Sequence, residues 1–444
     1  MNRWHATHAW VADGEGRVAH GVLIETDGRH ITAVAEDVAP PQDAFRLPGF
    51  VIPGLANVHS HAFHRAIRGR TERGDGDFWR WREHMYAVAA GLDPDIYFAL
   101  ARATYAEMAL AGITAVGEFH YLHHAADGRP YANPNAMGEV LVAAAEAAGV
   151  RITLIDTCYL HGGFGRQLEG PQLRFSDRAA DRWAERVASA PTGENIRNAA
   201  GIHSVRAVDP DAMRVVAAWA ADREVPLHVH VSEQPAENEA CLAATGRTPT
   251  ALLADCGVLG RRTTAVHATH VTAGDIGLLA EAQTFVAMCP TTERNLADGV
   301  GPADALVAAG SRLCFGSDSH AIIDLFEEAR AVELDERLAT GRRGHHRPEA
   351  LLQAATATGM ASLGWQAGRL APGQLADLVT LDLDSPRLAG AAADDLAAHV
   401  VFAAAAADVT HVVSNGRPVI IDRHHVGVGP VGPALSEAIG HALA

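Results

Sequence analysis

Short apolar runs alternate with longer helical patterns through the middle of the chain. The apolar runs have the length and composition of buried strands: Ile113–Val116, Ile152–Ile155, Leu227–Val231, Thr264–His267, Phe285–Cys289 and Leu313–Gly316. The stretches between them are rich in Ala and Leu and long enough for helices, as in Pro94–Ala111, Asn135–Ala148, Asp209–Asp222 and Leu325–Thr340. An alternation of this kind over roughly 300 residues is typical of a parallel sheet with crossover helices. It predicts an α/β protein with a closed (β/α)8 TIM-like barrel.

Both ends of the chain have strand patterns of a different kind. Near the N-terminus, Asp-Gly turns interrupt the strand-like runs Gly21–Ile24 and Ile31–Val34. After about Gly368 similar runs return, and the hairpin signal Asn415-Gly416 separates the last two: Ala376–Leu381, Val409–Ser414 and Pro418–Ile421. We therefore expect residues 1–50 and 368–444 to form two parts of one small β-sandwich beside a barrel of residues 51–367.

Composition and charge restrict the kind of molecule. Hydrophobic residues make up 48% and charged residues 20% of the chain, which is typical of a globular enzyme. The formal net charge of −17 argues against nucleic acid or an anionic membrane as a partner. We find no signal-peptide pattern and no apolar stretch of about 18 residues. The five cysteines are widely spaced without a Cys-x-x-Cys motif, which favours reduced thiols in a cytoplasmic protein.

Histidines stand at the ends of two predicted strands. An apolar run ends in the His-x-His motif of His59 and His61, and side chains two apart on a strand share a face. In the second run, His228 and His230 point away from the apolar side chains, and Glu233 follows. We interpret His230 as a metal ligand because it lies nearer the carboxyl end of the strand, where barrel active sites form. We interpret His228 as a buried neighbour of the site.

Two further strands end in groups of the same kind. His267 closes one strand, and His270 lies beyond it in a structural or solvent-facing position. Another buried strand runs into Asp318, with His320 two residues later. A buried carboxylate is costly without a partner, and a metal ion is a suitable one. Three imidazoles and one carboxylate suit Zn²⁺, with Fe²⁺ or Mn²⁺ as alternatives.

The whole chain resembles the amidohydrolase superfamily. The motifs that carry the resemblance are PGLANVHSH at 53–61, HVHVSE at 228–233, His267, SDS at 317–319 and APGQLADLV at 371–379. The resemblance implies that one divalent metal is bound by His59, His61, His230 and Asp318. Members with two metals usually carry a bridging Lys on the fourth strand. The corresponding segment here, GIHSVR at 201–206, has none, so a mononuclear site is expected.

Within the superfamily the chain resembles the formiminoglutamate deiminases of histidine degradation. The segments that carry this resemblance are HAFHRA at 61–66, DFWRWREHMY at 77–86, GEFHYLHH at 117–124, GIHSVRAV at 201–208 and CPTTERNL at 289–296. It implies hydrolysis of N-formimino-L-glutamate to N-formyl-L-glutamate and ammonia, and a homodimer. His64 stands where this family tends to have Gln, which places one polar substrate contact in question.

A dicarboxylate amidine substrate needs positive charge in the pocket of an acidic protein. Arginine binds carboxylates through two parallel hydrogen bonds. We expect Arg82, which lies among Trp79, Trp81 and Tyr86, and Arg206, at a strand end, to bind the two carboxylates. Tyr121, His203 and His64 are further candidate substrate contacts. Arg65, Arg68, Arg70 and Arg73 are interpreted as a solvated face, and the role of Arg80 is left open.

The mechanism follows from the resemblance and from metal chemistry. A bound divalent ion makes hydroxide available near neutral pH. Asp318 accepts the proton of the water, and His267 orients the water and stabilises the tetrahedral intermediate. Glu233 protonates the imine nitrogen and later carries a proton to the departing ammonia.

Three other functions remain open. A deaminase of a purine, pyrimidine or related ring would share the metal ligands and Glu233 but would not need two arginines. A non-catalytic assembly protein would not need the retained ligands. A metal-storage or sensor protein would need neither Glu233 nor the arginines.

Overall fold

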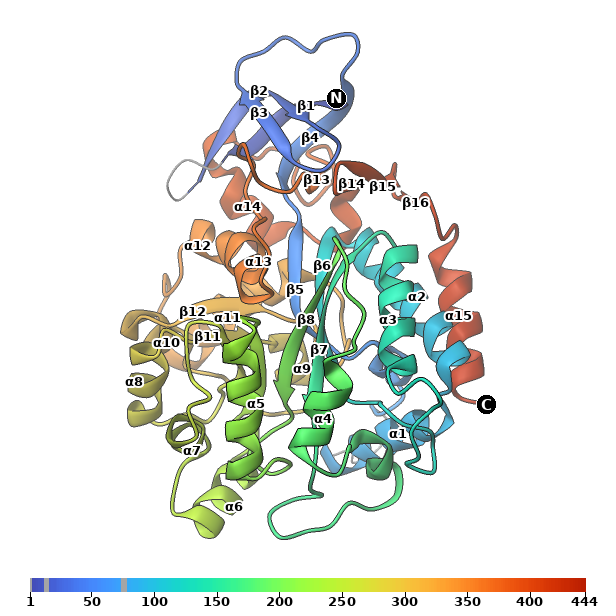
Figure 1. Cartoon of the computed structure of the whole chain (residues 1–444). Helices are drawn as coiled ribbons and strands as arrows, with labels where there is room; N and C mark the ends of the chain where they lie inside the picture. The colour runs from blue at the N-terminus through green and yellow to red at the C-terminus, as the bar shows by residue number, and fades with distance from the viewer. Residues whose placement is uncertain (1, 12–15, 73–77) are drawn as a thin grey trace.

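The computed structural model describes residues 2–11, 16–72 and 78–444, with the side chains of 78–80 left out of the description. Within these ranges the middle of the chain forms eight parallel strands that are hydrogen-bonded in chain order (Figure 1). The strands are β5 (Leu55–Ser60), β6 (Ile113–His120), β7 (Arg151–Cys158), β8 (Ile196–Ile202), β9 (Leu227–Val231), β10 (Thr263–His267), β11 (Phe285–Met288) and β12 (Arg312–Phe315). This arrangement confirms the predicted (β/α)8 barrel.

The barrel closes between its first and last strands. Ser60, at the end of β5, forms a parallel bridge with Asp318, which follows β12. The Asp318 amide donates to the His59 carbonyl at 3.0 Å, and the His61 amide donates to the Asp318 carbonyl at 3.3 Å. Gly316 permits this approach, because a Cβ atom there would lie 2.7 Å from the Cβ of His59. Closure therefore brings two histidines and an aspartate together at the carboxyl ends of the strands.

Helices cover the outside of the barrel, and several begin at a capping side chain. The Asp93 carboxylate accepts a hydrogen bond from the third amide of α2, and Asp209 caps α5 in the same way. Each such cap is worth about 1 kcal/mol. The helices up to residue 362 are α1 (Phe78–Gly91), α2 (Pro94–Leu110), α3 (Ala136–Ala147), α4 (Ala180–Val187), α5 (Pro210–Asp222), α6 (Pro235–Thr245), α7 (Pro249–Asp255), α8 (Ala273–Glu281), α9 (Pro290–Asn295), α10 (Ala303–Ala309), α11 (Leu325–Thr340), α12 (Pro348–Gln353) and α13 (Gly359–Ser362). In the described part of the chain, none of the helices has the length and apolar character needed to span a bilayer.

The two ends of the chain meet in a second, mixed sheet, which lies at the top of the molecule in Figure 1. Its order is β16-β15-β14-β13-β4-β1-β2-β3. The N-terminal strand β4 (Phe45–Pro53) therefore lies between β1 (Asn2–Val11) and the C-terminal strand β13 (Leu378–Leu381). The other strands are β2 (Arg17–Thr26), β3 (Ile31–Ala35), β14 (Val409–Ser414), β15 (Arg417–Ile421) and β16 (His424–His425). The expected union of the two ends is confirmed.

The structure adds two details about where the parts begin and end. Strand β4 continues beyond residue 50 to Pro53, so the barrel strands start at Leu55. The tail also contains helices α14 (Leu396–Ala403) and α15 (Val431–Ala442) besides its strands. In α15 the buried residues recur every three or four positions, as expected for a helix with one apolar face: Val431, Leu435, Ala438 and Ala442. Figure 1 shows α15 beside α2 on the flank of the barrel.

A buried ion pair joins the terminal sheet to the barrel. Arg151, at the start of β7, is fully buried and forms two hydrogen bonds with Asp377, which precedes β13. Its Nη2 also donates to the Asn415 side chain at 2.6 Å, and the Asn415 amide donates to Asp377 at 2.9 Å. Arg151 and Asp377 are fully buried, and both hydrogen-bond to Asn415, so the ion pair depends on all three groups.

We predict that Asp377→Ala destabilises the protein by about 3–5 kcal/mol, because it leaves the charge of Arg151 buried and unpaired. The midpoint of chemical unfolding measures the effect. Asp384→Ala, which removes an exposed carboxylate from the same tail, is the control and should change stability by less than about 0.5 kcal/mol. Equal effects of the two substitutions would contradict the assigned role of the ion pair.

Candidate metal centre and active site

Four buried side chains converge at the carboxyl end of the barrel: His59, His61, His230 and Asp318. Their ligand atoms all lie within 4.8 Å of one another. Asp318 Oδ1 lies 3.5 Å from His59 Nε2 and 3.3 Å from His61 Nε2, and His59 Nε2 lies 3.0 Å from His230 Nε2. Two ligands of a tetrahedral ion with ligand distances of about 2.1 Å are separated by about 3.4 Å. The observed spacings therefore fit a single metal ion.

Hydrogen bonds to the backbone orient two of these imidazoles. His61 Nδ1 donates to the Phe119 carbonyl at 3.1 Å, and His230 Nδ1 donates to the His203 carbonyl at 2.8 Å. A neutral ring with its proton on Nδ1 presents a bare Nε2, which is the form that binds metals. Burial lowers the pKa of His59 to about 4 and the pKa of His230 well below its usual value, which keeps both rings neutral. The donor set is chemically suited to a divalent cation.

His267 and Glu233 lie beside the four ligand atoms. His267 Nε2 is 3.8 Å from Asp318 Oδ2 and 3.9 Å from Glu233 Oε1, so the three groups face one small space. Burial opposes the charged form of His267, but Glu233, Glu293 and Asp318 outweigh it and raise its pKa to about 10. Burial and the nearby Asp318 carboxylate raise the pKa of Glu233, although His267 and Arg206 oppose this shift. This concentration of negative charge would be balanced by a cation.

The backbone at these positions adopts unusual conformations. The φ angles of His267 and Asp318 are 71° and 40°, in the left-handed region that residues other than glycine rarely occupy. Such strain persists only where surrounding contacts enforce it, and it is concentrated at functional sites. Here it turns both side chains from the ends of their strands into the common space.

Two buried carboxylates that support the site were not predicted from the sequence. Glu293 accepts from His267 Nδ1 at 3.2 Å and from the Cys289 amide at 2.9 Å, so it holds the ring that faces the ligands. Glu118 accepts from the Ser60 hydroxyl at 2.6 Å and from the Ala62 amide at 2.7 Å. Burial is the main cause that raises the pKa of Glu118 to about 7. Both lie in segments that carry the family resemblance, GEFH and CPTTE, which was the only available signal.

A cavity of about 70 Å³ lies against the ligand atoms. Aromatic side chains form much of its wall: Trp81, Tyr86, Tyr121, Tyr159 and Phe175. His203 also lines the cavity, as does His64, whose Nε2 lies 3.1 Å from the Tyr121 hydroxyl. The structure thus brings all the predicted substrate contacts to one space, together with Glu233 and three of the four metal-ligand candidates: His61, His230 and Asp318.

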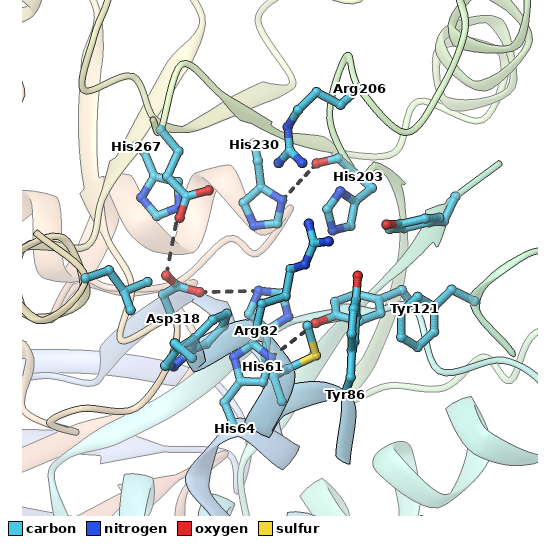
Figure 2. Close-up of a pocket in the computed structure, with 16 residues that line it drawn as sticks. His61, His64, Arg82, Tyr86, Tyr121, His203, Arg206, His230, His267 and Asp318 are labelled. Carbon is cyan, nitrogen blue, oxygen red and sulfur yellow. Dashed lines mark hydrogen bonds and ion pairs between the residues drawn. The ribbon is translucent and has the colours of Figure 1, made fainter. Parts of the chain in front are cut away.

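Two arginines reach the same cavity from opposite sides. Figure 2 shows the guanidinium groups of Arg82 and Arg206 turned toward one another above His61 and His230. Arg82 lies 5.3 Å from the centre of the Tyr86 ring. Arg206 Nε contacts Glu237 Oε2 at 3.3 Å, a partner that the sequence did not indicate. The Ser232 amide also donates to Glu237, which therefore fixes Arg206 to the loop that carries Glu233.

Other predicted positions lie away from the cavity. His228 Nε2 contacts the Ser362 carbonyl at 3.4 Å, and His270 Nε2 contacts the Asp298 carbonyl at 2.7 Å, which are structural contacts. His320 is buried and contacts the hydroxyls of Ser60 and Ser317, so it supports the loop of Asp318. Arg73 and the side chains of Trp79 and Arg80 fall outside the described residues.

The interpretation of the arginine loop as a solvated face is wrong for two of its members. Arg65 and Arg68 both bind Glu107 at 2.6 Å and are largely buried. Glu107 lies on α2, so this contact attaches the segment after His61 to the outer helix. Arg70 is exposed, as expected. The helix that carries Glu107 was predicted, but the pattern around Arg65 and Arg68 does not show that a carboxylate about forty residues away is their partner.

Comparisons with known proteins give the family. The amidohydrolase family profile matches residues 50–419. The chain is 37% identical over 439 residues to formimidoylglutamate deiminase from Pseudomonas aeruginosa, with 96% of each chain covered. It is 30% identical to a 5-methylthioadenosine/S-adenosylhomocysteine deaminase from Halobacterium salinarum, over 93% of this chain and 90% of the relative. The crystal structure of an amidohydrolase from Brucella melitensis matches over the full length of both chains, with a TM-score of 0.92 and 34% identity. The protein therefore belongs to the amidohydrolase family.

Proposed function

We propose that the protein hydrolyses N-formimino-L-glutamate to N-formyl-L-glutamate and ammonia. The observation that carries this proposal is the pair of guanidinium groups, Arg82 and Arg206, that face one another over the metal-ligand cluster. Two like charges so placed in a cavity are suited to a ligand with two negative charges. The relationship to a formimidoylglutamate deiminase supports the same reaction, and the family membership supports a hydrolase of C–N bonds.

The proposed cofactor is one divalent ion, with Zn²⁺ preferred over Fe²⁺ or Mn²⁺ because of the three-imidazole, one-carboxylate donor set. His59, His61, His230 and Asp318 would hold it. The ion would supply an activated water near neutral pH. A second metal bridged by a modified lysine does not fit this chain, because all 36 of its Lys and Arg residues are Arg.

The proposed proton transfers use the three groups that face the reaction space. Asp318 Oδ2 lies 3.8 Å from His267 Nε2 and is placed to accept the proton of the attacking water. His267, held through Nδ1 by Glu293, orients that water and stabilises negative charge on the tetrahedral carbon's oxygen. Glu233, whose pKa is raised chiefly by burial, is placed to give a proton to the imine nitrogen.

The remaining wall residues would position the substrate. Arg82 and Arg206 would each bind one carboxylate. Tyr121, His64 and His203 present a hydroxyl and two ring edges to the cavity, and Tyr121 and His64 already contact one another. In this proposal His64, in contact with Tyr121, takes the place of the Gln that the related deiminases tend to have at position 64.

One observation favours a second candidate function. The cavity has several aromatic walls, which would also suit a flat ring, and the chain is 30% identical to a 5-methylthioadenosine/S-adenosylhomocysteine deaminase. A ring deaminase would use the same metal ligands and Glu233. A ring deaminase would not need two guanidinium groups that face the cavity, and for that reason we prefer the dicarboxylate.

The first test is ammonia release by the zinc-loaded protein from N-formimino-L-glutamate, guanine, cytosine and 5-methylthioadenosine. We expect turnover of the first substrate alone. Glu233→Gln should lower kcat by about 10²–10⁴-fold, because it removes the proton donor while keeping its shape. Metal content serves as the control for that variant and should not change. Turnover of a ring compound instead would refute the proposal.

The second test addresses the two arginines. Arg82→Met and Arg206→Met should each lower kcat/KM for N-formimino-L-glutamate by about ten- to a hundredfold, the value of a charged hydrogen bond. Arg206→Lys keeps a charge beside Glu237 but loses the paired hydrogen bonds, so it should also be impaired. The matched control is Arg70→Met, which replaces an exposed arginine and should leave kcat/KM unchanged.

An analogue that lacks one carboxylate separates binding from folding effects. For whichever arginine binds the missing carboxylate, wild type and variant should process this analogue with similar kcat/KM. If both variants lose equal activity on the analogue and on the full substrate, the arginines do not bind the carboxylates.

The third test is metal removal. Chelation should abolish activity, Zn²⁺ should restore it, and the double variant His61→Ala/His230→Ala should bind one equivalent of metal fewer than the wild type. Bound metal at a thousand times its Kd should contribute about 4 kcal/mol to stability. The exposed His441→Ala is the control and should retain all metal. Full activity in a chelated, metal-free sample would contradict the assigned chemistry.

A further inference from the structure

A second group of potential metal ligands lies outside the active site, on the flank of the barrel. It consists of Asp304 on α10, Glu336 on α11, and His345 and His346 in the loop after α11, and we name it the flank cluster. The ligand atoms of Asp304, Glu336 and His345 all lie within 4.8 Å of one another. Figure 1 shows α10 on the outside of the barrel, away from the strand ends that carry the active site.

Hydrogen bonds determine which nitrogen of His345 faces this cluster without a proton. The Thr340 hydroxyl donates its single hydrogen to the Glu336 carbonyl at 2.7 Å. It must therefore accept in its contact of 2.9 Å with His345 Nε2, which places the ring proton on Nε2. His345 Nδ1 is then bare in the neutral ring, yet it lies 3.0 Å from Asp304 Oδ2 and 3.5 Å from Glu336 Oε2. The carboxylate oxygens of Asp304 and Glu336 and the lone pair of His345 Nδ1 therefore face one another. All three repel one another unless a positive charge lies between them.

A proton alone would leave part of the cluster unsatisfied. Glu336 Oε1 is occupied by the Asp304 amide at 2.8 Å, whereas Glu336 Oε2 and His346 Nε2 are buried without a hydrogen-bond partner among the described residues. These two atoms lie 3.5 Å apart. That distance is long for a hydrogen bond, which prefers about 2.7–3.2 Å. It matches two ligands on one tetrahedral ion, which are separated by about 3.4 Å.

We propose that the flank cluster is a second site for a divalent transition-metal cation of the Zn²⁺ class, with Glu336 Oε2, His345 Nδ1 and His346 Nε2 as ligands and Asp304 Oδ2 as a further oxygen donor. Two imidazoles and carboxylate oxygens form a donor set that suits Zn²⁺. The Thr340 hydroxyl orients His345 in the way that neighbouring groups orient metal-binding histidines in proteins. The side chains of His345, His346 and Glu336 are 2%, 4% and 8% exposed, so the site is built into the structure.

The position of the site suggests a structural role. Helix α10 leads into β12, the strand before Asp318, and α11 begins shortly after Asp318. A cation in the flank cluster would connect these two helices and the loop that follows them. Glu333 already attaches the same loop by accepting from the Gly344 amide at 2.9 Å and the His346 amide at 2.7 Å. The ligands are therefore held in place before an ion binds.

Another buried histidine group does not have these properties. His120, His123 and Asp156 also lie close together. However, Asp156 accepts from Arg186 at 2.7 Å through each oxygen and from the Trp183 indole at 3.0 Å. Its carboxylate is fully used by these donors, so it is not available to a cation.

The test compares bound zinc in full-length protein after equilibrium dialysis against Zn²⁺ at slightly alkaline pH. We expect His345→Gln/His346→Gln to bind one equivalent fewer than the wild type. The matched control is His424→Gln/His441→Gln, which removes two exposed histidines and should bind as much as the wild type. Equal zinc content in the wild type and in His345→Gln/His346→Gln would overturn the proposal, whatever happens at the active site.

A second measurement isolates the flank cluster. In the His61→Ala/His230→Ala background, Zn²⁺ at a hundred times its Kd should still raise Tm by roughly 2–4 °C or more. Adding His345→Gln/His346→Gln should remove that rise. A rise that persists in the four-fold variant would place the bound zinc elsewhere and overturn the assignment. If the four-fold variant does not fold, the difference in zinc content between wild type and His345→Gln/His346→Gln decides.

Discussion

The contact between the first and last barrel strands is the constraint on which the candidate active site depends. His59 and His61 belong to β5, and Asp318 follows β12 at the other end of the barrel sequence. Backbone hydrogen bonds between the His59, His61 and Asp318 segments join these ends directly. The same closure carries a candidate metal ligand on each side, so the geometry of the barrel and the geometry of the candidate site cannot vary independently. Gly316 is part of this constraint because no side chain fits between β12 and His59.

The parts of the site that could be predicted from the sequence are those with a local signal. His59, His61, His230 and Asp318 each follow a run of apolar residues, and strand ends of a parallel barrel meet at one rim. Glu118 also follows an apolar run, Ile113–Val116, but the sequence does not show which neighbours it or Glu293 contacts. Their importance arises from contacts with neighbouring strand ends, to Ser60 in one case and His267 in the other. The same reason explains the Glu107 contacts of Arg65 and Arg68, because the partners lie about forty residues apart in a different element.

The sign of the charge differs between the molecule as a whole and the cavity of its candidate active site. The chain carries a formal charge of −17, yet two guanidinium groups face one another inside the candidate active site. Glu237 contributes to this arrangement by binding Arg206. The surface would repel a dianion at long range, whereas the cavity would attract it at short range. Screening by salt reduces the first effect more than the second, because the buried charges are less exposed to ions.

The terminal sheet has a consequence for the order in which the protein can fold during synthesis. Strand β4 leads through Gly54 into β5, so it is continuous with the segment that carries His59 and His61. One edge of β4 pairs with β1, which is made earlier, but the other edge pairs with β13, where Pro53 lies opposite Leu378. That edge has no partner until nearly the whole chain has left the ribosome. The strand that carries the candidate ligands His59 and His61 is thus the first barrel strand to be made, but its surroundings are among the last to be completed.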